Sequence, residues 1–322
     1  MKLVILLFIV LTFCILTHSP LSLSYASLGL ELWFQKMIPS LLPFMILSGI
    51  MVRLRLTEKM SMALFPVLGP AYRVRKNVVY CMMLGFLCGF PMGAKTTADL
   101  LEREMLTEKE AEFLLAFCNN IGPVYFCSFV LPLLGRRLVA PYLFGMYGIP
   151  LLYGLFLRFT VYKNVLEGEA SGRAGRKQGP FPQLHICSRG KESRPFFGSR
   201  LLEAVDESIV SSLQSILTLG GYMILFNLLN LLPHVLLGRA PALLAPILEI
   251  TGGLSLLGDA LPLYSLLVLS FGGLSCIAQT YSCIRGTTLS VGNYICHKAV
   301  LTLLNGVFYL CWFLLAPASF LR

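Results

Sequence analysis

The sequence predicts an all-α protein that crosses a membrane several times. Of its 322 residues, 56% are hydrophobic and only 13% are charged, whereas about 25% of the residues of a soluble domain are charged. The mean hydropathy is +0.75. A water-facing surface of ordinary size cannot be built from so few charges. The composition therefore excludes a conventional soluble enzyme, and the many Phe, Tyr and Leu residues exclude a disordered chain.

Apolar segments recur along the whole chain, and most approach the roughly 20 residues that a membrane-spanning helix needs. The segments expected as simple spans are Leu3–Thr17, Met37–Val52, Val139–Leu157, Ile209–Leu232 and Ala299–Pro317. The segments expected to be broken by Gly or Pro are Val78–Met92, Leu114–Leu134, Ala242–Leu257 and Leu261–Ile284. The first span has the form of a signal peptide, but because further apolar segments follow it, we expect an uncleaved transmembrane helix.

A polar stretch divides the chain into halves. Between Tyr162 and Arg200 the residues are rich in Gly, Ser, Pro and Arg and show no apolar periodicity, which is typical of a flexible linker. The expected organisation is an N-terminal transmembrane helix (1–28), a first repeat (29–135), a connecting transmembrane helix (136–162), a basic cytoplasmic linker (163–205) and a second repeat (206–322).

The net charge of +10 indicates membrane orientation rather than a nucleic-acid partner. Basic residues outnumber acidic ones in residues 1–76 and again in residues 163–200, in both cases beside apolar segments. By the positive-inside rule these stretches lie in the cytoplasm. Arg136 and Arg137 fall outside in this scheme, against the rule. A nucleic-acid surface would instead need aromatic residues interleaved with the charges on a soluble face.

Short matches between the two halves predict an internal repeat. They occur in the same order: Phe44–Leu47 with Tyr222–Leu225, Phe65–Leu68 with Ala245–Leu248, and Gly85–Cys88 with Gly272–Ser275. With the linker inside, the helix that carries Phe44–Leu47 and the helix that carries Tyr222–Leu225 cross the membrane in opposite directions. An inverted repeat of this kind is typical of secondary transporters, whose sites lie at the membrane midplane between broken helices.

The first segment that could carry chemistry is GFLCGFPMGAK at Gly85–Lys95. Gly89, Pro91 and Gly93 are costly in a continuous helix and predict a re-entrant turn, which is tolerated at membrane depth where it is covered or lines a cavity. Lys95 is a candidate for binding substrate, because a lysine in a membrane segment is costly. The alternative is a lysine that reaches to the interface.

An acidic stretch and a pair of amides follow. Thr107-x-x-Glu110 predicts a capping box, and the carboxylates of residues 99–112 are expected on a solvated face. Asn119 and Asn120 precede Gly122 and Pro123, where a helix should unwind. We expect the two amides to face a substrate, since an amide offers donors and an acceptor. The alternative is that they cap the broken helix.

The remaining candidates lie in the second half. Gly272 and Gly273 should loosen a helix in which Ser275 and Gln279 place polar groups among apolar ones. Gln279 is suited to a carboxylate or a heteroaromatic ring, and hydrogen bonding between helices is the alternative. Glu249 is one of few acidic residues in the second repeat, and it could bind a cation or a proton, or pair with a buried base.

No sequence pattern indicates an enzyme, a cofactor or a metal centre. There is no nucleophile elbow, no phosphate-binding loop and no zinc-protease motif. The ten Cys and four His residues do not fall at the spacing of metal ligands, and most of the cysteines lie in apolar runs as packing residues. The expected partners are the lipid bilayer and a small solute, and assembly with further copies of the chain stays open.

Five motifs occur in order along the chain: GLELWFQKMIPSLLPFMILSG (29–49), GFLCGFPMGAK (85–95), LTEKEAEFLLAFCNNIGP (106–123), LEIT-GG (248–253) and SFGGLSCIAQTYS (270–282). Together they resemble the YlbJ-type sporulation integral membrane proteins, which belong with the nucleoside-recognition "Gate" domains. The resemblance runs through most of the chain except residues 163–208. It implies a transporter-like Gate fold, a spore-forming Gram-positive bacterium, and export of dipicolinic acid across the outer forespore membrane.

The residues themselves indicate only a small polar, anionic solute. Cys88, Phe90 and the Asn120-Ile121 pair depart from the pattern that the resemblance leads us to expect. Dipicolinate would suit the candidates, with its two carboxylates for Lys95 and the positive ends of helices and its ring for amides and aromatic side chains. The alternatives are a nucleoside-type carrier and a non-transporting membrane scaffold needed for sporulation.

Overall fold

The computed structural model describes residues 2–163 and 197–317. Its elements in these residues are all helical, which confirms the all-α class. Five helical segments of this part of the chain are long and apolar enough to cross a membrane: Ser19–Arg53, Arg136–Phe159, Arg200–Leu237, Pro262–Ile284 and Val291–Leu315. Most of the expected linker lies outside the described residues, and its end, 197–205, belongs to a long helix.

The first half begins with two helices that meet at His18. These are α1 (Lys2–Thr17) and α2 (Ser19–Leu32), and α2 continues through η1 (Trp33–Met37) into α3 (Ile38–Arg53). The expected boundary at residue 28 therefore falls inside a helix. The rest of this half comprises α4 (Thr57–Ser61), α5 (Phe65–Tyr72), α6 (Lys76–Cys88), α7 (Met92–Glu102), α8 (Glu108–Phe117), α9 (Pro123–Tyr125), η2 (Phe126–Val130), α10 (Leu131–Leu134), η3 (Arg136–Leu138), α11 (Val139–Leu143), η4 (Phe144–Gly148) and α12 (Ile149–Phe159).

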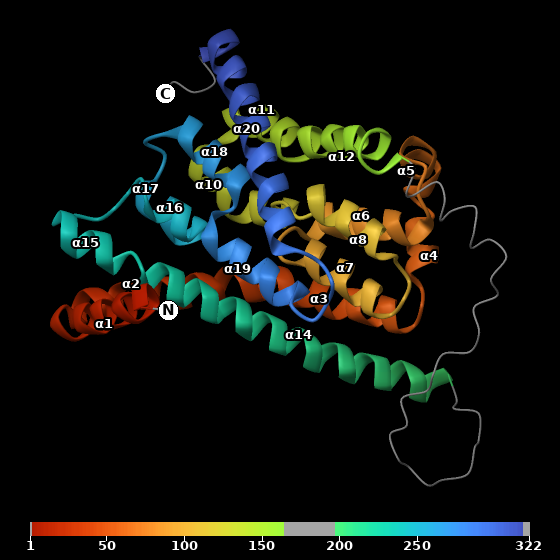
Figure 1. The fold of residues 1–322 in the computed structure, drawn as a ribbon, viewed down its shortest axis with the longest axis horizontal. Helices are drawn as coiled ribbons and strands as arrows, with labels where there is room; N and C mark the ends of the chain where they lie inside the picture. The colour runs from red at the N-terminus through yellow and green to blue at the C-terminus, as the bar shows by residue number, and fades with distance from the viewer. Residues whose placement is uncertain (1, 164–196, 318–322) are drawn as a thin grey trace, which may run out of the picture.

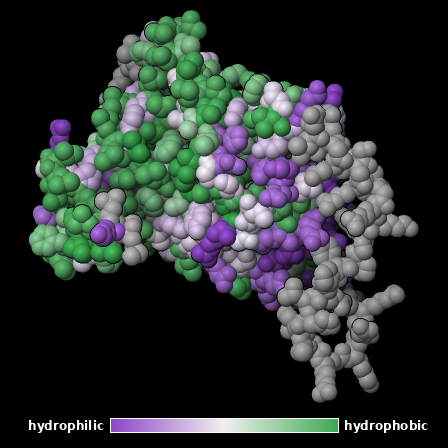
Figure 2. All heavy atoms as spheres, in the orientation of Figure 1, coloured by the Kyte–Doolittle hydropathy of each residue, from purple (hydrophilic) through white to green (hydrophobic). Residues whose placement is uncertain are grey.

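The second half starts with the longest helix and ends with a continuous span (Figure 1). Its elements are α14 (Phe197–Leu228), α15 (Leu231–Leu237), α16 (Ala245–Leu248), α17 (Ile250–Leu257), α18 (Pro262–Phe271), α19 (Gly273–Ile284) and α20 (Val291–Leu315). Hydrophobic side chains cover the side of the molecule formed by α1, α15 and α20, and hydrophilic ones gather around α4, α7 and α8 (Figure 2). This division is what a protein held in a bilayer requires.

The helix α14 packs against α2 and α3 in the antiparallel direction (Figure 1). Gly29 lies against Ile224, the Trp33 indole nitrogen donates to the Ile216 carbonyl at 2.8 Å, and Arg53 pairs with Glu207 at 2.9 Å. As the residue number rises along α2 and α3, the number of the contacting residue in α14 falls. The helices that carry Phe44–Leu47 and Tyr222–Leu225 thus run in opposite directions, as an inverted repeat requires, although the repeat itself stays a prediction.

Two helix breaks in the first half pack backbone against backbone. Between α6 and α7, Gly89 has a φ of 76°, which favours glycine, and a side chain there would overlap the backbone nitrogen of Gly122. The Phe90 N–H donates to the Asn120 carbonyl at 2.8 Å. Each break therefore supplies a hydrogen-bond partner for a backbone group of the other break that has no partner within a helix.

A third break, in the second half, meets these two. Gly272 and Gly273 have φ values of 86° and 79° and separate α18 from α19. A Cβ on Gly272 would lie 3.0 Å from the Phe90 ring. The interrupted helices of both halves therefore converge around Phe90.

The start of α8 has the capping box that the sequence predicts, but one of the nearby carboxylates is buried rather than solvated. Thr107 and Glu110 form the capping box in both directions, as predicted. Glu102, Glu104 and Glu108 are exposed. Glu110 is instead 4% exposed and forms an ion pair with Arg75, because the same carboxylate that caps the helix faces the core between α6 and α8.

The close approach at Gly89 can be tested with a glycine that has free space. Gly89→Ala should lower the free energy of unfolding by roughly 3 kcal/mol, because alanine is strained at this φ and its methyl group overlaps Gly122. Gly221→Ala in α14, where nothing lies within 4 Å of the added Cβ, should be neutral or slightly stabilising. Denaturation of both variants in detergent provides the measurement, and equal stabilities would contradict the packing of the two breaks.

Candidate functional site

Two adjoining cavities lie where the broken helices converge. A small inner cavity of about 50 Å³ lies between the breaks of both halves. An outer cleft of about 310 Å³ lies between α7, α14 and α19. Leu219 and Gln279 line both, and Phe90 lines the inner cavity while Pro91 lines the outer cleft. The break between α6 and α7 therefore stands at the boundary of the two.

The inner cavity has a mainly apolar wall with a few polar groups. Its apolar lining comes from η1, α3, α14 and the breaks: Met37, Leu41, Phe90, Ile121, Leu219 and Met223. Its polar lining is Ser40, Tyr125, Glu249, Thr251 and Gln279. Such a mixture is typical of sites for small organic ligands, in which apolar contact supplies affinity and a few polar groups fix the orientation.

Glu249 lines the inner cavity and caps the N-terminus of α17. The side chain is 2% exposed. Its carboxylate accepts from the backbone N–H groups of Thr251 at 3.1 Å and Gly252 at 2.6 Å, and from the Asn227 amide at 3.1 Å. The positive end of a helix and a neutral amide thus stabilise the charge. Among the described residues no base pairs with it at salt-bridge distance.

Gln279 lines both cavities. Its amide nitrogen donates to the Ser275 hydroxyl at 2.9 Å, one turn earlier in α19. Ser275 is fully buried and lines neither cavity, so its role in this arrangement is to orient Gln279. The glycines 272 and 273, at the start of α19, set the direction in which this helix enters the site.

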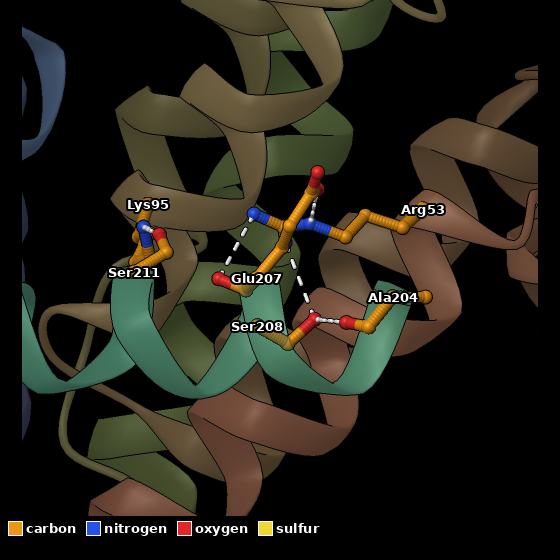
Figure 3. Close-up of polar contacts among 6 residues, drawn as sticks. All are labelled: Arg53, Lys95, Ala204, Glu207, Ser208 and Ser211. Atoms are coloured by element: carbon orange, nitrogen blue, oxygen red, sulfur yellow. Dashed lines mark hydrogen bonds and ion pairs between the residues drawn. The ribbon is translucent and has the colours of Figure 1, made fainter. Parts of the chain in front are cut away.

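Lys95 lies in the outer cleft rather than in the inner cavity. Its ammonium is 3.7 Å from the Asp99 carboxylate. It also lies 3.4 Å from the Ser211 hydroxyl of α14 (Figure 3). Further along α14, Arg53 of α3 contacts Glu207 and Ser208. Glu102 and Arg285, both exposed, also line the cleft. The cleft therefore carries charges of both signs and is accessible to water.

Asn119 and Asn120 contact protein groups, and neither lines the inner cavity or the outer cleft. Asn119 accepts from the Ala94 N–H at 3.3 Å and donates to Thr280 at 2.9 Å, which joins the start of α7 to α19. Asn120 donates to the Phe117 carbonyl at 2.6 Å at the end of α8. In this arrangement the two amides stabilise the helix break that includes Gly122 and Pro123, which is the capping alternative. A contact with substrate stays a prediction.

Lys298 is a buried cation that sequence reasoning missed. It lies on α20 and is 2% exposed. The last span was expected to start at Ala299, so a lysine just before it had the position of an interfacial residue. A signal was present, because Tyr294, Lys298, Asn305 and Tyr309 recur at the spacing of one helix face, and all four are buried.

Comparison with known proteins gives one relative. The chain is 30% identical over 240 residues to the sporulation integral membrane protein YlbJ of Bacillus subtilis (strain 168). The aligned region covers 71% of this chain and 55% of that protein, so the chain spans about half the length of the relative. No family model matches the chain, and no solved structure matches it.

The capping role of Glu249 leads to a test of stability. Glu249→Gln should lower the free energy of unfolding by about 1–3 kcal/mol, because an amide nitrogen would face donors that now have an acceptor. Glu31→Gln, on the exposed side of α2, makes the same change without those donors and should have no effect. Thermal unfolding of the two variants in detergent makes the comparison, and a wild-type melting curve for Glu249→Gln would contradict the role.

Proposed function

This chain is a relative of the YlbJ-type sporulation integral membrane proteins, and from that premise we propose that it transports a small anionic solute. The relative's name states sporulation and the membrane, and says nothing of a solute. Transport is our inference from the two cavities. The proposed solute is dipicolinate, and the proposed membrane is the outer forespore membrane of a sporulating cell.

One observation carries the proposal: the outer cleft and the inner cavity adjoin at Leu219 and Gln279, beside the broken helices. A scaffold needs no polar cleft beside a cavity between helix breaks. A secondary transporter does, because its solute passes from water to a midplane site formed by such breaks. The inner cavity, at about 50 Å³, is smaller than the roughly 300–1,000 Å³ of small-molecule sites, so the proposed solute requires the cavity to widen.

The chemistry of the lining supports an anion with a flat ring. Lys95 and Arg285 supply cations in the outer cleft, whose lining also contains Asp99 and Glu102. Within the inner cavity, Phe90 and Tyr125 offer ring faces, and Gln279 offers an amide to a carboxylate or a ring nitrogen. Movement of the second half against the first would then open the cavity to alternate sides of the membrane.

Transport can be measured on the purified full-length chain in proteoliposomes. We expect uptake of labelled dipicolinate, and Gln279→Ala should reduce its initial rate by about tenfold or more, as loss of a hydrogen bond to a charged group implies. Gln35→Ala, at an exposed position of η1, should leave the rate unchanged.

The competing functions give different results in the same assay. Inhibition of uptake by uridine or adenosine would indicate a nucleoside-type carrier. Wild-type liposomes that take up neither dipicolinate nor nucleosides would contradict transport and favour a scaffold.

A further inference from the structure

The ammonium of Lys298 is buried in α20, a helix long and apolar enough to cross a membrane. The side chain is 2% exposed, and among the described residues no Asp or Glu forms an ion pair with it. A lysine at membrane depth costs about 2.5–3.5 kcal/mol on insertion scales, and such residues face the bundle interior where they serve a function. The question is what this charge does.

Its neighbours are neutral and belong to the two helix breaks of the first half. The Lys298 nitrogen donates to the Asn120 side-chain oxygen at 3.0 Å and to the Asn119 carbonyl at 3.4 Å. It also lies over the Phe90 ring, 4.5 Å from its centre. Dipoles and a ring face solvate the ammonium here, but they do not neutralise it.

The inner cavity begins on the other side of these neighbours. Phe90 and Ile121, which follows Asn120, line the cavity, and so does Cys276 of α19. The Phe90 ring thus contacts the ammonium and also lines the cavity. A Cβ on Gly272 would come within 3.0 Å of the same ring.

We propose that Lys298 is the cation that pairs with a carboxylate of the solute in the inner cavity, and that Phe90 is a movable partition that covers it when the cavity is empty. The proposal rests on the proposed function and names the charge of its binding site. Lys298 is already removed from water and held in place, so pairing requires little further desolvation or ordering of the lysine. The carboxylate of Glu249, which also lines this cavity, accepts hydrogen bonds from two N–H groups at the start of α17. These donors reduce its repulsion of the anion.

A purely structural role is the competing account. In that account Lys298 serves only to donate hydrogen bonds to the Asn119 and Asn120 oxygens. Gln at this position keeps a donor and removes the charge, whereas Arg keeps the charge. The two accounts therefore differ in the charge preference of binding, and not only in stability.

The test is calorimetric binding of two ligands to the purified full-length chain in detergent: dipicolinate, and its neutral diamide, pyridine-2,6-dicarboxamide. The wild type should bind the dianion at least about tenfold more tightly than the diamide, a difference of about 1.4 kcal/mol. Lys298→Arg should keep this preference, and Lys298→Gln should lose it while still binding the diamide. Lys36→Gln, which removes an exposed charge from η1, should behave as wild type.

A second variant tests the partition and leaves Lys298 unchanged. Phe90→Ala should speed the association of dipicolinate by about threefold or more, because the ring no longer has to move before the ion pair forms. Stopped-flow tryptophan fluorescence measures this rate, and Phe34→Ala, which removes an exposed ring, is its control.

The outcomes separate the two proposals. A Lys298→Gln variant that keeps the preference for the dianion overturns the role of Lys298, and an unchanged association rate in Phe90→Ala overturns the partition. If Lys298→Gln does not fold, loss of the preference in Lys298→Arg would equally overturn the role. A wild type that binds neither dipicolinate nor the diamide would instead overturn the proposed transport of dipicolinate.

Discussion

The pairing of two helix breaks with each other is the constraint on which the rest of this structure depends. A helix that stops inside an apolar environment leaves backbone N–H and carbonyl groups that need partners. Here the Phe90 N–H donates to the Asn120 carbonyl, and Gly89 lies against Gly122 with no room for a side chain. The interruption of α6 and α8 is therefore stable only because both helices are interrupted at the same place. The inner cavity exists beside this point because the helices do not continue through it.

The same breaks determine how buried charge is held around the cavity. Glu249 is stabilised by the N-terminus of α17, which the interruption after α16 creates. Lys298 is stabilised by carbonyl and amide oxygens at the break after α8. Among the described residues, each charge is compensated by backbone dipoles and side-chain amides rather than by an opposite charge. A charge held in this way can still attract a solute of opposite charge, whereas the two charges of an internal ion pair would neutralise each other.

The sequence was sufficient to predict an all-α membrane protein and insufficient to predict the orientation of individual side chains. Low charge and recurring apolar segments predict membrane helices, and local chemistry predicts the Thr107–Glu110 capping box, because these depend on neighbouring residues. The direction in which Asn119 and Asn120 point depends on α19 and α20, more than 150 residues away in the chain, and no local pattern contains it. Lys298 was missed for a related reason, since α20 begins at Val291 and the apolar run alone begins later.

Determination of the experimental structure in lipid nanodiscs, with and without saturating dipicolinate, tests the central claim most directly. The account predicts ligand density in the inner cavity, with one carboxylate near Gln279 and the ring between Phe90 and Tyr125, and with both helix breaks paired as described. Continuous helices through residues 88–92 or 118–122, or a cavity that stays empty while the ligand binds elsewhere, would contradict it.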